Sequence, residues 1–276
     1  MRIGLLVSVT IARAQTSSSQ SAFAESAAQE VSFPSGTLTL HGFLFKPQGE
    51  GPFPAILWNH GSERLPGRLQ PLADFFTGKG YVFFVPHRRG QGRSADAAPY
   101  VMDVLRREGE QRGPSARSAK LVEMMEIHLQ DQLAALSYMR SLPAVNTKRI
   151  AVMGCSFGGI QTLLAAANAT DIQASIDFAG GAESWKGSSD LRALMTKAAR
   201  NANVPVLFIQ AEGDYDLSPS RVLAKEMEKG GKPAQIHIYP SVGHSHQENH
   251  EFCVHGVDVW GPDVLAFMEK AFAQQK

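Results

Sequence analysis

Short apolar runs alternate along the chain with longer segments in which apolar residues recur three or four positions apart. Continuous apolar runs indicate strands buried on both faces, and the longer pattern indicates helices packed against them. The predicted strands cover residues 55–58, 81–86, 150–154, 174–178, 204–210 and 234–239. The predicted helices cover residues 69–79, 121–142, 162–167, 191–201, 219–230 and 261–274. This alternation predicts an α/β fold with a mostly parallel central sheet and helices on both faces.

Two segments depart from the alternation of buried strand and helix. Residues 31–45 alternate apolar with polar positions, which predicts an antiparallel hairpin at an edge of the sheet. Residues 95–120 are polar and charged and contain no strand-like run. Because this stretch is longer than an ordinary loop, we expect either a small helical lid or a mobile segment there.

The first residues have the pattern of an export signal. Arg2 precedes an apolar run, and Ala12-Arg13-Ala14 has the small-residue spacing of a cleavage site. The sequence therefore predicts a signal peptide over residues 1–14 and a secreted or periplasmic protein. Residues 15–30 are rich in Ser, Ala and Gln and predict a disordered leader. A single domain is expected over residues 31–276.

Composition narrows the possible partners. The chain has 276 residues, 43% of them hydrophobic, which suffices for one large core. Its formal net charge is only +1 and no basic block occurs, so neither nucleic acid nor a membrane surface is an expected partner. No later segment approaches the roughly 20 apolar residues of a membrane span. We expect a small-molecule partner, and the sequence does not indicate an oligomeric state.

The strongest chemical motif is Gly154-Cys155-Ser156-Phe157-Gly158, which follows a predicted strand and precedes a predicted helix. The pattern G-x-S-x-G between strand and helix is typical of a nucleophile elbow, in which the serine hydroxyl stands exposed on a tight turn. Ser156 is therefore the candidate nucleophile. An ordinary strand-to-helix turn that happens to contain a serine is the alternative.

A serine nucleophile needs an imidazole to accept its proton and a carboxylate to orient that imidazole. Asp214 and Asp216 follow the strand at residues 204–210, and we favour Asp214 because it lies closer to the strand end. For the base, His244 and His250 remain equal candidates on spacing alone. The order serine, acid, histidine is the one found in α/β-hydrolases.

Backbone amides at two strand ends are candidates for an oxyanion hole. Gly61 lets the chain turn after the strand at residues 55–58, so the N–H of Ser62 or its neighbour can point at a ligand. The second expected donor is the N–H of Phe157, directly after the nucleophile. A simple strand-ending turn at Gly61 is the alternative.

Two further residues are candidates for substrate contact. Arg88 lies in a glycine-punctuated basic loop and could bind a substrate carboxylate, although we favour a structural role, for instance toward Glu63. Trp185 follows the strand at residues 174–178 and would form either a wall of the cleft or part of the core.

The two cysteines, Cys155 and Cys253, are expected to be free thiols, because Cys155 lies inside the elbow. The chain has no C-x-x-C or H-E-x-x-H motif, so neither a metal nor an organic cofactor is expected.

Together these motifs resemble the dienelactone-hydrolase-like branch of the α/β-hydrolase superfamily, which is similar to the catalytic domain of prolyl oligopeptidases. The resemblance rests on the elbow, the His60-Gly61 strand end, the Val204-Pro205 strand that leads to an acid, and the helix after Trp260. It covers roughly residues 31–272 and implies the α/β-hydrolase fold.

The resemblance also implies roles for individual residues. The family's acid matches Asp214, and its histidine, followed by phenylalanine and a later tryptophan, matches His250, Phe252 and Trp260. His250 is therefore favoured as the base, with His244 in reserve. The family's dienelactone hydrolases proper have cysteine where this chain has Ser156, so dienelactone activity is not implied. The stretch after Asp214 is one residue longer than usual, which keeps Asp216 as an alternative acid.

Three functions are compatible with the sequence. The favoured one is a secreted serine hydrolase that cleaves carboxylic esters through an acyl-enzyme. A peptidase of the prolyl-oligopeptidase kind ranks lower because the chain lacks the long N-terminal propeller of those enzymes. A non-catalytic binding protein on the same fold is the third.

Overall fold

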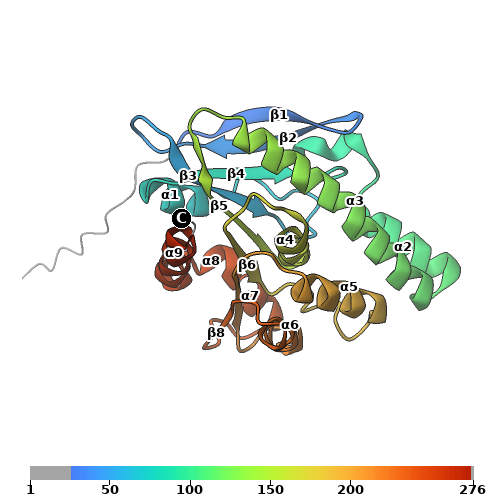
Figure 1. Ribbon diagram of the computed structural model, residues 1–276. Helices are drawn as coiled ribbons and strands as arrows, with labels where there is room; N and C mark the ends of the chain where they lie inside the picture. Colours follow the sequence, from blue (N-terminus) through green and yellow to red (C-terminus); the bar gives the residue numbers. More distant parts are fainter. Residues whose placement is uncertain (1–25, 275–276) are drawn as a thin grey trace, which may run out of the picture.

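A computed structural model describes residues 26–274 of the protein (Figure 1). The predicted signal peptide therefore lies outside the described residues. The strands are β1 (Gln29–Ser35), β2 (Leu38–Phe45), β3 (Phe53–Asn59), β4 (Val82–His87), β5 (Val145–Cys155), β6 (Ala174–Phe178), β7 (Val206–Ala211) and β8 (Ala234–Tyr239). The helices are α1 (Gln70–Gly78), η1 (Gly92–Ala97), α2 (Val101–Arg112), α3 (Pro114–Arg140), α4 (Phe157–Asn168), α5 (Ser189–Arg200), α6 (Ser218–Lys229), α7 (His246–His250), α8 (Phe252–His255) and α9 (Val257–Ala273).

The strands form one eight-stranded sheet in the order β1-β2-β4-β3-β5-β6-β7-β8. β1 and β2 pair antiparallel, as do β2 and β4, and every other pair is parallel. The predicted edge hairpin and the predicted mostly parallel sheet are both confirmed. Parallel neighbours require crossover connections, and the helices provide them.

Helices cover both faces of the sheet (Figure 1). Side chains that alternate along a central strand enter two separate cores, because successive residues of a strand point to opposite faces. In β3, Leu57 packs with residues of α3, α4 and α5, whereas Ile56 and Trp58 pack with residues of α1 and α9. All three side chains are fully buried. Central strands therefore appear in the sequence as continuous apolar runs.

The N-terminal boundary of the domain lies earlier than predicted. Gln29 and Glu30 belong to β1 and pair with Leu44 and Phe43 of β2, although the sequence had placed both in a disordered leader. The polar composition of residues 15–30 concealed a strand that is half exposed at the sheet edge. The prediction of a disordered leader over residues 15–30 is therefore wrong for its last two residues, which belong to a strand.

The segment at residues 95–120 is helical. It contains η1, α2 and the first turns of α3, which begins at Pro114. Proline fits this position because the first residues of a helix need no intrahelical N–H bond, and Gly113 accommodates the preceding turn with a φ of 87°. The segment is therefore helical, which was one of the two expectations, and a lid role stays a prediction. α3 starts seven residues before the predicted helix.

The carboxyl ends of the parallel strands meet at one edge of the sheet, where α/β proteins commonly bind ligands. Ser156 follows β5, Ser62 follows β3 and Asp214 follows β7. Sequence segments between 58 and 152 residues apart thereby contribute to one region of the surface. None of the helices described between residues 26 and 274 has the length and hydropathy needed to cross a membrane.

Candidate active site

Ser156 occupies the tight turn between β5 and α4. Its backbone has φ 57° and ψ −115°, a conformation that is uncommon for a residue with a side chain. The Ser156 N–H donates to the carbonyl oxygen of Phe178 in the neighbouring strand at 2.9 Å, which helps to hold this geometry. The strained serine is the geometry expected of a nucleophile elbow.

Two glycines make the elbow possible. A Cβ atom on Gly154 would lie 2.4 Å from the carbonyl oxygen of Gly158, and one on Gly158 would lie 2.0 Å from the carbonyl oxygen of Asn59. Both separations are far below van der Waals contact. Only glycine therefore allows β5, α4 and β3 to approach this closely, and Ser156 is carried at their meeting point.

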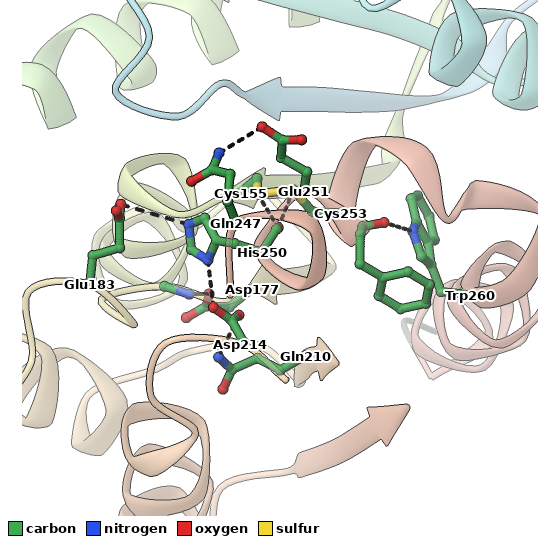
Figure 2. Close-up of a disulfide and its surroundings, with 12 residues drawn as sticks. Cys155, Asp177, Glu183, Gln210, Asp214, Gln247, His250, Glu251, Cys253 and Trp260 are labelled. Carbon is green, nitrogen blue, oxygen red and sulfur yellow. Dashed lines mark hydrogen bonds and ion pairs between the residues drawn. A yellow bond between two sulfur atoms is a disulfide. The ribbon is translucent and has the colours of Figure 1, made fainter. Parts of the chain in front are cut away.

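His250 and Asp214 are joined by a buried hydrogen bond. The Nδ1 atom of His250 lies 2.8 Å from Oδ1 of Asp214, and both residues are at most 6% exposed (Figure 2). The Asp214 carboxylate also accepts from the Tyr215 N–H at 2.7 Å and from Nε2 of Gln210 at 2.9 Å. Ser220 donates to Oε1 of Gln210 and fixes the orientation of that amide. The carboxylate is thus fixed against one nitrogen of the imidazole.

The other imidazole nitrogen is free of hydrogen bonds. Nε2 of His250 has no hydrogen-bond partner in the described part of the chain, so it does not bond to Ser156 here. A carboxylate oxygen of Glu183 lies 3.9 Å from it (Figure 2). Burial lowers the pKa of His250, but the hydrogen bond and charge of Asp214 and the charges of Glu183 and Glu251 outweigh burial and raise the pKa above its usual value.

One cavity of about 410 Å³ brings Ser156 and His250 to the same surface. Its wall contains three glutamates, which are Glu63, Glu183 and Glu251. A second, narrower cavity of about 40 Å³ also reaches Ser156. Apolar side chains of α2, α3 and α4 form part of its lining, among them Met102, Leu105, Leu121, Met125 and Ile160. The charged side chains of Arg117 and Glu183 also line it.

Both expected oxyanion donors are placed at these cavities. Phe157 is the first residue of α4, where a backbone N–H has no intrahelical acceptor, and it lines the narrower cavity. Ser62 lines both cavities together with Ser156. Tyr100 of the lid segment donates its hydroxyl to the Ser62 carbonyl oxygen at 2.5 Å, which fixes the loop after β3.

The alternative acid and base lie elsewhere. Asp216 accepts the Ser218 N–H at 2.9 Å at the start of α6, and its other oxygen lies 3.8 Å from Nζ of Lys186. His244 is exposed, and its backbone N–H donates to Glu248. The structure therefore brings together Ser156, Asp214 and His250 and leaves the alternatives outside this arrangement.

Arg88 and Trp185 lie behind the cavity walls. Arg88 is 2% exposed, donates to the Gly61 carbonyl oxygen at 2.6 Å and stacks over the ring of Phe157 at 5.0 Å. Trp185 is 7% exposed and belongs to the core that contains Leu191. Neither lines either cavity that reaches Ser156. For both residues the structure favours the packing alternative over direct substrate contact.

The expectation of free thiols is wrong. Cys155 and Cys253 form a disulfide that joins positions 98 residues apart, with a Cα–Cα distance of 6.0 Å (Figure 2). No local pattern predicts this bond, because the two cysteines become neighbours only when α8 packs against the end of β5. The elbow does not need a mobile Cys155, since its shape is set by the glycines around it.

Two functional candidates were absent from the sequence-based prediction. Gln210 precedes Asp214 by four residues and could have been suspected as a polar residue within an apolar strand. Glu183 lies in a turn after β6, and no sequence signal places it at His250. Within residues 26–274, no group of three or more His, Cys, Asp or Glu side chains has the arrangement of a metal site.

Comparison with known proteins shows the family of the chain. The model of the dienelactone hydrolase family matches residues 40–257. The chain belongs to the dienelactone hydrolase family. Its fold is the α/β-hydrolase fold, as the eight-stranded sheet and the solved structures below both indicate.

Curated relatives of this family member include the quorum-quenching protein AidA of Acinetobacter baumannii. It is 26% identical over 170 residues, which are 60% of this chain and 48% of AidA. Human dipeptidyl peptidase 8 is 25% identical over 242 residues, which are 78% of this chain and 26% of the peptidase. The chain thus spans about half or less of the length of these relatives.

Solved structures share the fold at lower identity. A dienelactone hydrolase candidate from Klebsiella pneumoniae superposes with a TM-score of 0.62 at 21% identity, over 90% of this chain and 98% of that chain. The acylaminoacyl peptidase of Pyrococcus horikoshii has a TM-score of 0.62 at 18% identity, over 86% of this chain and 42% of that chain. A puromycin-hydrolyzing peptidase of Mycobacterium tuberculosis has a TM-score of 0.65 at 17% identity, over 90% of this chain and 39% of that chain.

Proposed function

We propose that this protein is a serine hydrolase that cleaves carboxylic esters of small molecules through an acyl-enzyme on Ser156. The observation that carries the proposal is the His250–Asp214 hydrogen bond at 2.8 Å beside a strained serine on the wall of the same cavity. One imidazole nitrogen is held by a carboxylate, and the other is left without a hydrogen bond. That is the division of roles that a serine nucleophile requires.

The proposed reaction proceeds in two halves. Oγ of Ser156 attacks the ester carbonyl carbon while Nε2 of His250 takes the hydroxyl proton, and Asp214 stabilises the imidazolium through Nδ1–H. The imidazolium then gives its proton to the leaving alcohol, and the acyl group remains on Ser156. A water molecule, deprotonated by the same imidazole, releases the acid and restores the serine.

The negative charge of each tetrahedral intermediate falls on the former carbonyl oxygen. The backbone N–H groups of Phe157 and Ser62 are the proposed donors to it, each worth on the order of 3 kcal/mol in the barrier. The narrower cavity beside Ser156, with apolar side chains on part of its wall, suits a short acyl group, and the wider cavity suits the alcohol.

Replacement of the nucleophile tests the proposal. Ser156→Ala should abolish turnover of a p-nitrophenyl ester while leaving the thermal unfolding transition cooperative, because alanine removes only the hydroxyl. Ser241→Ala, at an exposed position, is the matched control and should retain full activity. Undiminished turnover by Ser156→Ala would refute the proposal.

A peptidase is the second candidate, favoured by the 25% identity to dipeptidyl peptidase 8 over 78% of this chain. Comparison of an ester with the matching anilide of proline, at equal concentration, separates the two functions. We expect the ester to be cleaved much faster, and efficient cleavage of the proline anilide would reverse the order. A non-catalytic binding protein would cleave neither.

We also propose that the protein works in an oxidising compartment, either secreted or periplasmic. The support is the Cys155–Cys253 disulfide, since such bonds persist mainly outside the reducing cytosol. Cell fractionation followed by thiol counting tests this. Recovery of the protein in the cytosolic fraction with two free thiols would contradict it.

A further inference from the structure

The disulfide links the two loops that carry the proposed nucleophile and base. Cys155 directly precedes Ser156, and Cys253 follows His250 by three residues. The Cys253 sulfur also lies 3.3 Å from the carbonyl oxygen of His250 (Figure 2). One covalent bond therefore fixes the end of β5 to the helical turns that hold the imidazole.

The other hydrogen bonds of α7 are local or run to the turn after β7. His250 is the last residue of α7, which has only five residues, and most side chains from Pro240 to Glu248 are exposed. A helix this short has little stability of its own. Ser245 and Glu248 cap its start, and Asn249 donates to the carbonyl oxygen of Ser245. These contacts are local to the segment. Two further bonds, from His246 to the carbonyl oxygen of Gly213 at 2.7 Å and from the Tyr215 hydroxyl to Gln247 at 2.8 Å, tie α7 to the turn after β7 and not to the elbow.

The elbow itself does not depend on the disulfide. Ser156 is held by the hydrogen bond to Phe178 and by the close packing at Gly154 and Gly158. Loss of the disulfide would therefore leave the serine in place and release mainly the base. On the base side, the hydrogen bond to Asp214 and the Tyr215 ring, whose centroid lies 5.3 Å from that of His250, would remain.

We propose that the Cys155–Cys253 disulfide positions His250 relative to Ser156, so that a dithiol reductant switches the hydrolase off by opening this bond. The inference rests on the proposed function of the same site. In the reaction, a thiolate of the dithiol attacks one cystine sulfur and forms a mixed disulfide. Its second thiol then closes a cyclic disulfide, and Cys155 and Cys253 receive two electrons and two protons as free thiols.

The disulfide is placed where a small reductant can reach it. Cys155 and Cys253 are only 7% and 3% exposed, but both line the cavity of about 410 Å³ that contains Ser156. We therefore expect the reductant to enter through this cavity. A phosphonate bound to Ser156 should slow reduction by a dithiol, whereas it would not affect a disulfide reached from elsewhere.

The expected effect is on turnover more than on binding. A displacement of about 1 Å in a catalytic group can cost about a hundredfold in rate. Reduction should therefore lower kcat for p-nitrophenyl acetate by about tenfold to a hundredfold and change KM by less than about threefold. A purely structural role would leave kcat unchanged as long as the protein remains folded.

The test compares the oxidised protein, the protein reduced by a dithiol, and the double variant Cys155→Ala/Cys253→Ala. We expect reduced wild type, with two thiols counted, to lose kcat and to regain it on reoxidation. The double variant should have the same low kcat with and without the dithiol, which controls for effects of the reductant elsewhere. Wild-type kcat in the folded double variant would overturn the proposal.

Two further outcomes are decisive. If the double variant fails to fold, wild type whose reduced thiols have been alkylated takes its place, and full activity of that folded protein overturns the proposal. Unfolding of both overturns it as well, because the disulfide would then support the whole fold and not the base. An oxidised wild type without any esterase activity would instead refute the proposed function, independently of the redox comparison.

Discussion

Two carboxylates flank the imidazole of His250, one beside each nitrogen. Asp214 accepts a hydrogen bond from Nδ1 of His250. Glu183, on the cavity wall, lies 3.9 Å from Nε2. Glu251 adds a third negative charge from the following residue. Because all three favour the protonated ring, they raise the pKa of His250 against the effect of burial.

This arrangement predicts the direction of a shift in the pH profile. The base acts when neutral, so activity should appear as the pH rises through the pKa of His250. Glu183→Gln removes one negative charge, which lowers that pKa and moves the acid limb of kcat/KM to lower pH. Glu228→Gln, exposed on α6, is the control and should leave the profile in place. An unshifted acid limb in Glu183→Gln would show that Glu183 does not act on the base.

Asp177 is a second buried carboxyl group with a distinct role. It accepts the Gly180 N–H at 2.7 Å through Oδ1, while Oδ2 has no hydrogen-bond partner in the described residues. Burial raises the pKa of Asp177 to about 7, although the Gly180 hydrogen bond acts in the opposite direction. The folded protein therefore binds a proton on Asp177 that the unfolded chain releases near pH 4.

A pH-dependent stability follows from this proton. The pKa of Asp177 is higher in the folded protein than in the unfolded chain. The free energy of unfolding is therefore highest below about pH 4, where Asp177 is neutral in both states, and falls as the pH rises to about 7. Asp177→Asn keeps an acceptor for Gly180 and cannot ionise. Relative to wild type, we expect this variant to gain on the order of 4 kcal/mol between about pH 4 and pH 8. Urea unfolding at both pH values measures the difference, and a pH-independent difference would contradict this assignment.

The sequence predicted Ser156 and Asp214 because each stands in a local pattern, an elbow and a strand end. It left His244 and His250 undecided on spacing, because the imidazole is positioned by packing across the sheet edge and not by its own neighbours. Glu183 and the disulfide were missed for the same reason. They depend on contacts between segments that only the folded sheet brings together.

At the level of elements, the turn between β7 and α6 uses its two acids differently. Asp214 holds His250, whereas Asp216 accepts the N–H of Ser218 at the start of α6. The positive end of the helix dipole at the start of α6 favours a carboxylate such as that of Asp216. The turn thus holds the candidate base with one acid and the first backbone N–H of α6 with the other.

The two acids should respond differently to the same substitution. Asp214→Asn should lower kcat by about a thousandfold or more, because the amide favours the wrong imidazole tautomer. Asp216→Asn should leave kcat within a few fold and cost at most about 1 kcal/mol of stability, since the asparagine oxygen can accept the same Ser218 N–H. Ester kinetics and thermal melting of both variants provide the comparison. The reverse pattern would make Asp216 the acid.

Most helices and strands were predictable because the apolar residues of each recur at one spacing and glycine or proline marks its ends. α9 shows where this fails: it begins at Val257, four residues before the predicted start at Gly261. Trp260 packs against Phe178 with ring centroids 4.6 Å apart and donates to the Phe252 carbonyl oxygen at 3.0 Å. These tertiary contacts hold a helical turn that the Gly261-Pro262 pair would by itself end.

For the molecule as a whole, charge is distributed unevenly around the cavity of about 410 Å³. The chain has a net charge of only +1, yet Glu63, Glu183 and Glu251 line this cavity and no lysine or arginine does. Within residues 26–274, none of the three carboxylates has a lysine or arginine within 4.0 Å. A negative potential is therefore expected beside Ser156.

This potential predicts a preference for cationic alcohol groups. A choline ester should have a kcat/KM several fold higher than its uncharged isostere, the 3,3-dimethylbutyl ester, at low ionic strength. The advantage should largely disappear near 1 M salt, where the Debye length is about 3 Å. The ratio of the two substrates cancels any general effect of salt on the enzyme. Equal efficiencies at low salt would show that the cavity charge does not select the substrate.

The central claim is that Ser156 is activated by His250, and covalent labelling tests it most directly. After treatment with a fluorophosphonate, intact-mass analysis and peptide mapping should find one adduct, on Ser156, in the oxidised wild type. Ser156→Ala should carry no adduct, and His250→Ala should label at least about a hundredfold more slowly, because the imidazole no longer accepts the hydroxyl proton. An unlabelled but folded wild type, or an adduct that persists in Ser156→Ala, would contradict the account.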